Sequence, residues 1–203
     1  MTLPHIVAIS GSPRRPSKTS ALVELIAAEV VGCTRARLDI FDLVDAGPGL
    51  GAALQRSDLT LPAARIIDAI EQADALIVGT PVYKGGYTGL FKHIFDLVEP
   101  QSLAGKPVVI TATGGGPRHA LVVEHALRPL FGFFEALTIP TAVYASDADF
   151  LNGELSDARV LARTSAAAQQ LAEALNASRL RTGAALQNAL IGFQVVPREA
   201  AAG

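Results

Sequence analysis

The fold is decided by the stretch Ile6-Val-Ala-Ile-Ser-Gly-Ser-Pro-Arg-Arg-Pro-Ser-Lys-Thr-Ser20. Its first four residues are apolar without interruption, which predicts a strand that is buried on both faces. Gly11 and Pro13 end the strand, Ser17 is a favourable N-cap, and the apolar spacing from residue 21 to residue 31 predicts a helix that packs back on the sheet.

A strand, a short loop and a helix start leave several backbone N–H groups without partners at one place. Arg14, Arg15 and Lys18 add positive charge there, and no acidic residue lies between Ser10 and Ser20. Helix N-termini with nearby cations bind anions, so this loop is predicted to bind a phosphate group.

The loop does not match the two best-known nucleotide motifs. A triphosphate P-loop needs glycine one and six residues before its lysine, where Lys18 has Ser17 and Ser12. The dinucleotide motif needs three glycines, and Gly11 stands alone. Two interpretations remain. The loop either holds a terminal monophosphate with its hydroxyl groups, as flavodoxin-like proteins hold FMN, or is an ordinary polar loop without a ligand.

Composition excludes several classes of protein. The chain has 203 residues, of which 50% are hydrophobic, and a formal net charge of −2. Its basic residues are dispersed beyond the first loop, which argues against nucleic-acid and membrane partners. One cysteine, four dispersed histidines and a strand-like start predict a cytoplasmic protein without a disulfide or a metal site.

Strands and helices alternate along the chain. Such alternation predicts right-handed crossovers and an α/β fold, with five parallel strands in the flavodoxin-like order 2-1-3-4-5 and helices on both faces. The strands are expected at residues 6–9, 35–43, 74–80, 106–113 and 138–144, and the helices at residues 21–31, 61–73, 90–98, 119–137 and 157–175. Residues 1–178 are predicted to form a single domain, followed by a tail, 179–203, that is partly helical and then disordered from about Pro197.

Three further segments carry expectations of their own. Residues 45–59 contain three glycines and one proline, and are expected to form a mobile loop. Residues 146–156 are expected to form a polar loop. The helix at 119–137 is apolar around most of its circumference, so one side is expected to pack on another subunit.

In this strand order the loops after strands 1, 3 and 4 meet at one edge of the sheet. They comprise residues 11–20, 81–89 and 113–117. The first suits a phosphate, the second offers an aromatic edge, and the third is nearly bare backbone. A flat heterocycle with a phosphate tail fits this combination, which indicates FMN.

From about Ile6 to Phe150 the chain resembles the NAD(P)H-dependent FMN reductases of two-component monooxygenase systems. The likeness is greatest to the methanesulfonate branch, then to the alkanesulfonate branch. It rests on Gly11-Ser-Pro-Arg14, Pro16-Ser-Lys-Thr-Ser20, Gly79-Thr-Pro-Val-Tyr-Lys84, Thr113-Gly-Gly115 and Glu124-His-Ala-Leu-Arg-Pro129.

The resemblance implies a set of ligand-binding residues. On the FMN phosphate it places Ser12, Arg14, Ser17, Lys18, Thr19 and Ser20. Along the isoalloxazine it places Pro81, Val82, Tyr83, Lys84 and Gly85, and at the pyrimidine end Thr113, Gly114 and Gly115. Tyr83 can equally fill the loop or an interface.

His125 lies where the alkanesulfonate branch carries an inserted tyrosine that forms a π-bulge at a tetramer interface. The resemblance therefore implies a π-bulge here, a homo-oligomer (dimer or tetramer), and a flavin that leaves after reduction. An ordinary packed histidine is the alternative.

The implied activity is hydride transfer from NADH or NADPH to FMN, with FMNH₂ supplied to a separate flavin-dependent monooxygenase of sulfonate desulfonation. No side chain is expected to act as a catalytic acid or base, and the backbone N–H groups of Gly114 and Gly115 are candidates for stabilising charge at flavin N1 and O2. Three alternatives stay open: a quinone or azo reductase with tightly bound FMN, a flavodoxin-type electron carrier, and a phosphate-binding regulator. The sequence does not distinguish NADH from NADPH.

Overall fold

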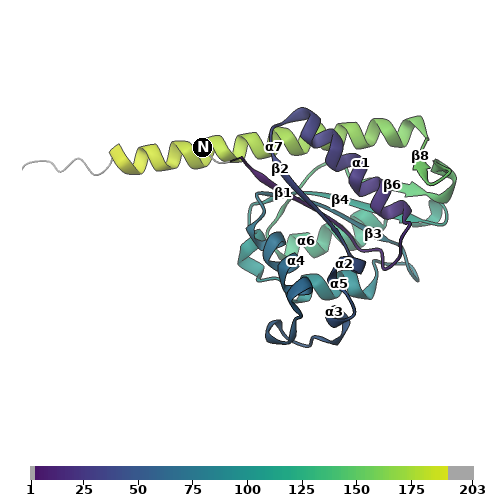
Figure 1. Cartoon of the computed structure of the whole chain (residues 1–203). Helices are drawn as coiled ribbons and strands as arrows, with labels where there is room; N and C mark the ends of the chain where they lie inside the picture. The colour runs from purple at the N-terminus through teal and green to yellow at the C-terminus, as the bar shows by residue number, and fades with distance from the viewer. Residues whose placement is uncertain (1–2, 192–203) are drawn as a thin grey trace, which may run out of the picture.

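The computed structural model describes residues 3–191 and shows a three-layer α/β fold (Figure 1). Its sheet is parallel, with the order β2-β1-β3-β4, and the short strands β5 and β6 both pair with β4. This confirms the predicted flavodoxin-like order. The strands are β1 (His5–Ser10), β2 (Arg37–Asp42), β3 (Ala75–Pro81), β4 (Pro107–Gly114), β5 (Leu137–Thr138) and β6 (Val143–Ser146).

Helices cover both faces of the sheet. Figure 1 shows α1 (Lys18–Cys33) and α7 (Ala158–Ile191) on one side. The other side carries α2 (Leu43–Ala46), α3 (Gly49–Ala52), α4 (Leu61–Gln72), α5 (Gly89–Asp96) and α6 (Arg128–Phe133). Strand β1 shows why its apolar run is continuous: Ile6 and Ala8 belong to the core under α1 and α7, whereas Val7 and Ile9 belong to the core under α4 and α5.

Shorter elements complete the described chain. There are 3₁₀ turns at Arg56–Asp58, Pro100–Leu103, Pro117–His119 and Asp147–Asp149, a π-helix at Val123–Leu127, and an antiparallel pair β7 (Phe150–Leu151) and β8 (Glu154–Leu155). Within residues 3–191 no helix combines the length and the apolar character needed to cross a bilayer.

The predicted fifth strand is split in two. β5 ends at Thr138 and β6 begins at Val143, because Pro140 has no N–H to donate to β4. Side chains of α7 bond to the backbone in the gap instead: the Thr141 N–H donates to Gln170 Oε1 at 3.0 Å, and Arg163 donates to the Ala142 carbonyl at 2.7 Å.

Residues 45–59 do not form the irregular loop that their glycines predicted, since α2, α3 and a 3₁₀ turn occupy most of them. A capping box explains α2: the Asp42 side chain accepts from the backbone of Asp45, whose side chain accepts from the backbone of Asp42. The predicted polar loop 146–156 likewise holds the β7–β8 pair.

The last helix is longer than predicted. α7 begins at Ala158 and continues past residue 178 to Ile191 (Figure 1). The predicted disorder from about Pro197 lies outside the described residues.

Candidate functional site

The three predicted loops meet at the carboxyl edge of the sheet, as expected, and hydrogen bonds join each pair. The Gly11 N–H donates to the Gly79 carbonyl in β3 at 2.6 Å, and the Gly11 carbonyl accepts from Thr88 Oγ1 in the second loop at 3.0 Å. The Val82 N–H donates to the Thr113 carbonyl at 2.7 Å. One continuous rim therefore carries residues from all three loops.

The first loop presents N–H groups at the start of α1. Ser17 is the N-cap, and its hydroxyl accepts from the Ser20 N–H at 3.3 Å. The backbone N–H groups of Ser17, Lys18 and Thr19 have no acceptor among residues 3–191. These three donors match what an anion requires at the N-terminus of a sixteen-residue helix.

Ser12 and Arg14 shape the same loop. The Ser12 side chain is buried, and its hydroxyl donates to the Arg14 carbonyl at 3.2 Å. The exposed Arg14 guanidinium has no ion-pair partner within the described part of the chain. Arg14 is thus a cation at the loop with its charge unneutralised.

The other two cations of the loop are already paired. Lys18 Nζ donates to Asp147 at 2.7 Å and lies 5.5 Å from the centre of the Phe150 ring. Arg15 binds Asp42 and Asp45 at the end of β2. The prediction that Arg15 adds free positive charge for an anion is therefore wrong, because two carboxylates neutralise it.

Two hydroxyls of the loop point into the fold. Thr19 Oγ1 lies 2.6 Å from Thr113 Oγ1, and both residues are buried. Ser20 Oγ donates to Ser10 Oγ at 3.0 Å. The Thr19–Thr113 bond joins the first loop to the third, so these two hydroxyls serve the shape of the rim.

The second loop is a tight hairpin. Tyr83 and Gly86 exchange backbone hydrogen bonds of 2.9 and 3.2 Å, and the residues between them, Lys84 and Gly85, have φ angles of 53° and 91°. Two consecutive positive φ values are typical of a type I′ turn. The turn leaves Tyr83 and Lys84 exposed beside Pro81.

The glycines of the third loop differ in their surroundings. A Cβ on Gly114 would lie 2.5 Å from the Tyr144 hydroxyl, which itself donates to the Gly116 carbonyl at 2.6 Å. Gly115 is exposed, and the nearest atom to its Cβ position is an Asp147 carboxylate oxygen at 3.8 Å. Partial burial, together with Asp147 and Asp149, raises the pKa of Tyr144.

A fourth loop, which the sequence analysis did not assign to the site, also reaches the rim. It follows β6 and contains Asp147 and Phe150, both in contact with Lys18. The available signal was the parallel direction of the fifth strand, whose carboxyl end lies at the same edge of the sheet as the others.

The π-helix implied at His125 is present. The Arg128 N–H bonds to the Val123 carbonyl, five residues earlier, and His125 is exposed. Pro129 gives a physical reason, since it has no N–H and its ring would clash with the carbonyl of His125 in a regular α-helix. Widening the turn before the proline avoids that clash.

Arg128 fixes the π-helix to the strand beside it. It pairs with Glu124 and also donates to Thr138 Oγ1 at 2.9 Å and to the Ile139 carbonyl at 3.2 Å. Leu121 and Phe133 are exposed in the single chain, so the packing of one side of this helix on another subunit stays a prediction.

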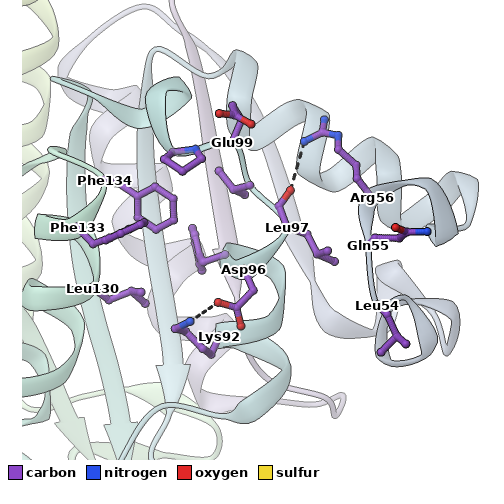
Figure 2. A pocket seen from close by; sticks show the side chains of 13 residues that line it. Leu54, Gln55, Arg56, Lys92, Asp96, Leu97, Glu99, Leu130, Phe133 and Phe134 are labelled. Carbon is purple, nitrogen blue, oxygen red and sulfur yellow. Dashed lines mark hydrogen bonds and ion pairs between the residues drawn. The ribbon is translucent and has the colours of Figure 1, made fainter.

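A separate hollow of about 660 Å³ lies between the end of α5, the 3₁₀ turn at Arg56–Asp58 and α6. Figure 2 shows Phe133 and Phe134 on one side of it, Leu54 on the other, and the Lys92–Asp96 ion pair between them. None of the residues predicted to bind a ligand lines this hollow, so it is distinct from the rim.

Known proteins resemble this chain over most of its length. A family model described as "NADPH-dependent FMN reductase" matches residues 4–150. The NADH-dependent FMN reductase SfnF of Pseudomonas fluorescens (strain Pf0-1) is 46% identical over 167 residues, which cover 82% of this chain and 89% of that protein. An FMN reductase (NADPH) of Pseudomonas aeruginosa PAO1 is 44% identical over 173 residues, covering 85% and 93%.

A solved structure with a similar sequence and fold is also that of a flavin reductase. The apo form of the NADH:FMN oxidoreductase EMOB is 32% identical, with a TM-score of 0.74 and coverage of 84% of this chain and 89% of that one. The family match and the relatives together show that this chain belongs to the NADPH-dependent FMN reductase family.

Proposed function

We propose that this protein transfers hydride from NADH or NADPH to FMN and releases the reduced flavin to a separate flavin-dependent monooxygenase, in a system that removes sulfonate groups. The observation that carries this proposal is the first loop, where three backbone N–H groups and the unpaired Arg14 guanidinium lie at the meeting point of three loops. Family membership supports the reaction class.

The residues present fit FMN on two grounds. The donor set of the first loop suits a dianionic phosphate, because charge-assisted hydrogen bonds from amides and a guanidinium are strong. The side of Gly115 is open, so a flat ring can approach the backbone there, which a Cβ would hinder.

The phosphate is assigned to the first loop. Its ligands in this proposal are the Arg14 guanidinium, the Lys18 ammonium and the N–H groups from Ser17 to Thr19, with Ser12 and Ser20 shaping the loop. Lys18 leaves Asp147 or shares its charge with the phosphate. Thr19 contributes its N–H in this proposal and not its hydroxyl, because the hydroxyl bonds to Thr113 Oγ1.

The ring is assigned to the other two loops. Residues 81–85 form one wall, held by the hairpin hydrogen bonds of Tyr83 and Gly86, and residues 113–115 form the pyrimidine end. Bound FMN supplies the hydride acceptor of the reaction. The rigid rim aligns the two substrates and excludes water from one side, and the N–H groups of Gly114 and Gly115 stabilise negative charge that develops at the ring edge.

Two properties of the assembly belong to the same proposal. The exposed apolar residues Leu121 and Phe133, near the π-helix, support a homo-oligomer formed through this helix. His125 is exposed on the π-helix and is assigned to that interface. A cytoplasmic location, where both nicotinamide coenzymes are available, completes the proposal.

Flavin retention separates this function from its main alternative. Protein saturated with FMN is passed through a gel-filtration column, and NADH and NADPH oxidation is then followed with and without added FMN. Loss of flavin on the column and oxidation that depends on added FMN are expected. Stoichiometric retained FMN would instead indicate a quinone or azo reductase, and no oxidation with either coenzyme would indicate an electron carrier or a regulator.

A further inference from the structure

Two adjacent arginines of the first loop have opposite surroundings. Arg14 has no ion-pair partner within residues 3–191. Arg15 makes a bidentate pair with Asp42, with Nε donating to one carboxylate oxygen at 2.5 Å and Nη2 to the other at 2.9 Å. Arg15 Nη2 also lies 2.7 Å from Asp45 Oδ1. Arg15 is thus bound to the end of β2 and not to the rim.

The carboxylates that bind Arg15 are themselves fixed. The Asp42 side chain is only 7% exposed, and it accepts from the Val44 N–H at 2.8 Å and the Asp45 N–H at 3.2 Å. Partial burial tends to raise the pKa of Asp45, but hydrogen bonds from the Asp42 N–H and from Arg15 outweigh it, so the pKa is lowered and Asp45 is ionised at neutral pH. Arg15 therefore meets a preformed, charged acceptor on the rigid sheet.

The Arg15 pairs are also the anchors of this part of the loop. Within the described residues, the side chain of Arg15 makes the hydrogen bonds that tie residues 13–16 to another part of the chain. Arg14 lies directly before Arg15, and the N-cap Ser17 lies two residues after it. Holding Arg15 consequently restricts both the guanidinium and the helix start that are assigned to the phosphate.

We propose that Asp42 and Asp45 are positioning residues for flavin reduction: they clamp Arg15 and so hold the first loop in the form that binds the FMN phosphate. The inference rests on the proposed function. It gives the end of β2 a part in the site, although β2 is not one of the strands whose loops meet at the rim. A loop that is ordered before binding loses less conformational entropy when it binds.

The test compares two flavins that differ by the phosphate. Asp42→Asn keeps an oxygen that can cap α2 but removes the negative charge of the Arg15–Asp42 ion pair. Arg15→Gln removes the positive charge of the same pair, at a side chain that is exposed. Each variant is expected to raise the KM and the Kd for FMN about tenfold, while the values for riboflavin and the kcat stay within about twofold. Fluorescence quenching gives Kd, and nicotinamide oxidation gives KM and kcat.

Glu71→Gln is a matched control. Arg56 is held by Glu71 and Asp68 as Arg15 is held by Asp42 and Asp45, but this second cluster lies at the amino edge of the sheet, where Lys106 also binds the Glu71 carbonyl. We expect Glu71→Gln to leave both flavins unaffected.

Several results would overturn the clamp. Equal losses for FMN and riboflavin in Asp42→Asn would indicate a general folding defect, and wild-type values in both variants would show that the loop needs no clamp. A loss in Arg15→Gln without one in Asp42→Asn would mean that Arg15 binds the phosphate itself. A wild-type protein that reduces neither flavin would refute the proposed function, which the other outcomes leave standing.

Discussion

Gly114→Ala is predicted to destabilise the protein through Tyr144. The new Cβ would lie 2.5 Å from the Tyr144 hydroxyl, so the ring must move and its 2.6 Å hydrogen bond to the Gly116 carbonyl must break. Overpacking of this kind costs about 1–3 kcal/mol and a neutral hydrogen bond contributes about 1 kcal/mol. Replacing glycine by alanine also lowers the conformational entropy of the unfolded chain, which offsets about 0.4–1 kcal/mol of this loss. We expect a net loss of about 1–3.5 kcal/mol.

The partner mutation makes this prediction specific. In Tyr144→Phe the hydroxyl is absent, and the nearest remaining neighbours of the Cβ position are Tyr144 Cζ at 3.4 Å and Val82 Cβ at 3.5 Å, near or at ordinary contact distance. Adding Gly114→Ala to that variant should therefore change the free energy of unfolding little, which corresponds to a coupling of about 1–3.5 kcal/mol between the two positions.

Urea unfolding of the four proteins in this double-mutant cycle measures the coupling. Gly115→Ala is the control, because no atom lies closer than 3.8 Å to its Cβ position, and it should not lose stability. Additive effects within about 0.5 kcal/mol, or a loss in Gly115→Ala equal to that in Gly114→Ala, would refute the packing argument.

Three further predictions concern the loop and the π-helix. Arg14→Ala should raise the KM for FMN, because it removes a charge-assisted contact that contributes about 1.5–3 kcal/mol. Lys18→Ala should raise this KM less, because Asp147 already pairs with Lys18. An equal rise in the KM for riboflavin would contradict the phosphate assignment. Deletion of His125 should change the oligomeric state or the rate of flavin release more than hydride transfer, and wild-type behaviour in gel filtration and stopped-flow release would make it ordinary packing. The hydrogen bond from Arg128 lowers the pKa of Glu124 in the folded protein. The pair therefore stabilises the fold fully at pH values above the ordinary glutamate pKa of about 4.3, and this stabilisation is lost as the pH falls through the lowered pKa. Because both side chains are partly exposed, the effect should be at most about 0.5 kcal/mol; Glu124→Gln should abolish it in unfolding measurements at pH 7 and pH 3, and an unchanged pH dependence would exclude the pair as its source.

The sequence predicted the parts of the site that depend on local chemistry. The apolar run of β1, the N-cap Ser17 and the loops after β3 and β4 are all encoded by neighbouring residues, and the strand order then brings them together. The π-helix at His125 was implied by the family resemblance and not by the residues themselves, although Pro129, within one turn, gives it a local cause.

Features that depend on partners distant in sequence were missed. From its neighbours in the sequence Arg15 was expected to be an unpaired cation, but in the structure it pairs with Asp42, 27 residues later. Lys18 likewise pairs with Asp147, which lies on a different loop of the rim. The break in the fifth strand was signalled by Pro140, but the Gln170 side chain that satisfies the neighbouring N–H belongs to the last helix. Single residues did not reveal these pairs because each depends on the register of the finished sheet.

In the function proposed here, one FMN lies across three loops with its phosphate on the first. A crystal structure of the FMN complex tests this position of the flavin most directly. We predict phosphate density against the N–H groups of Ser17 to Thr19 and the Arg14 guanidinium, with the ring between residues 81–85 and 113–115. Flavin density in the hollow of Figure 2, with the rim empty, would contradict the claim.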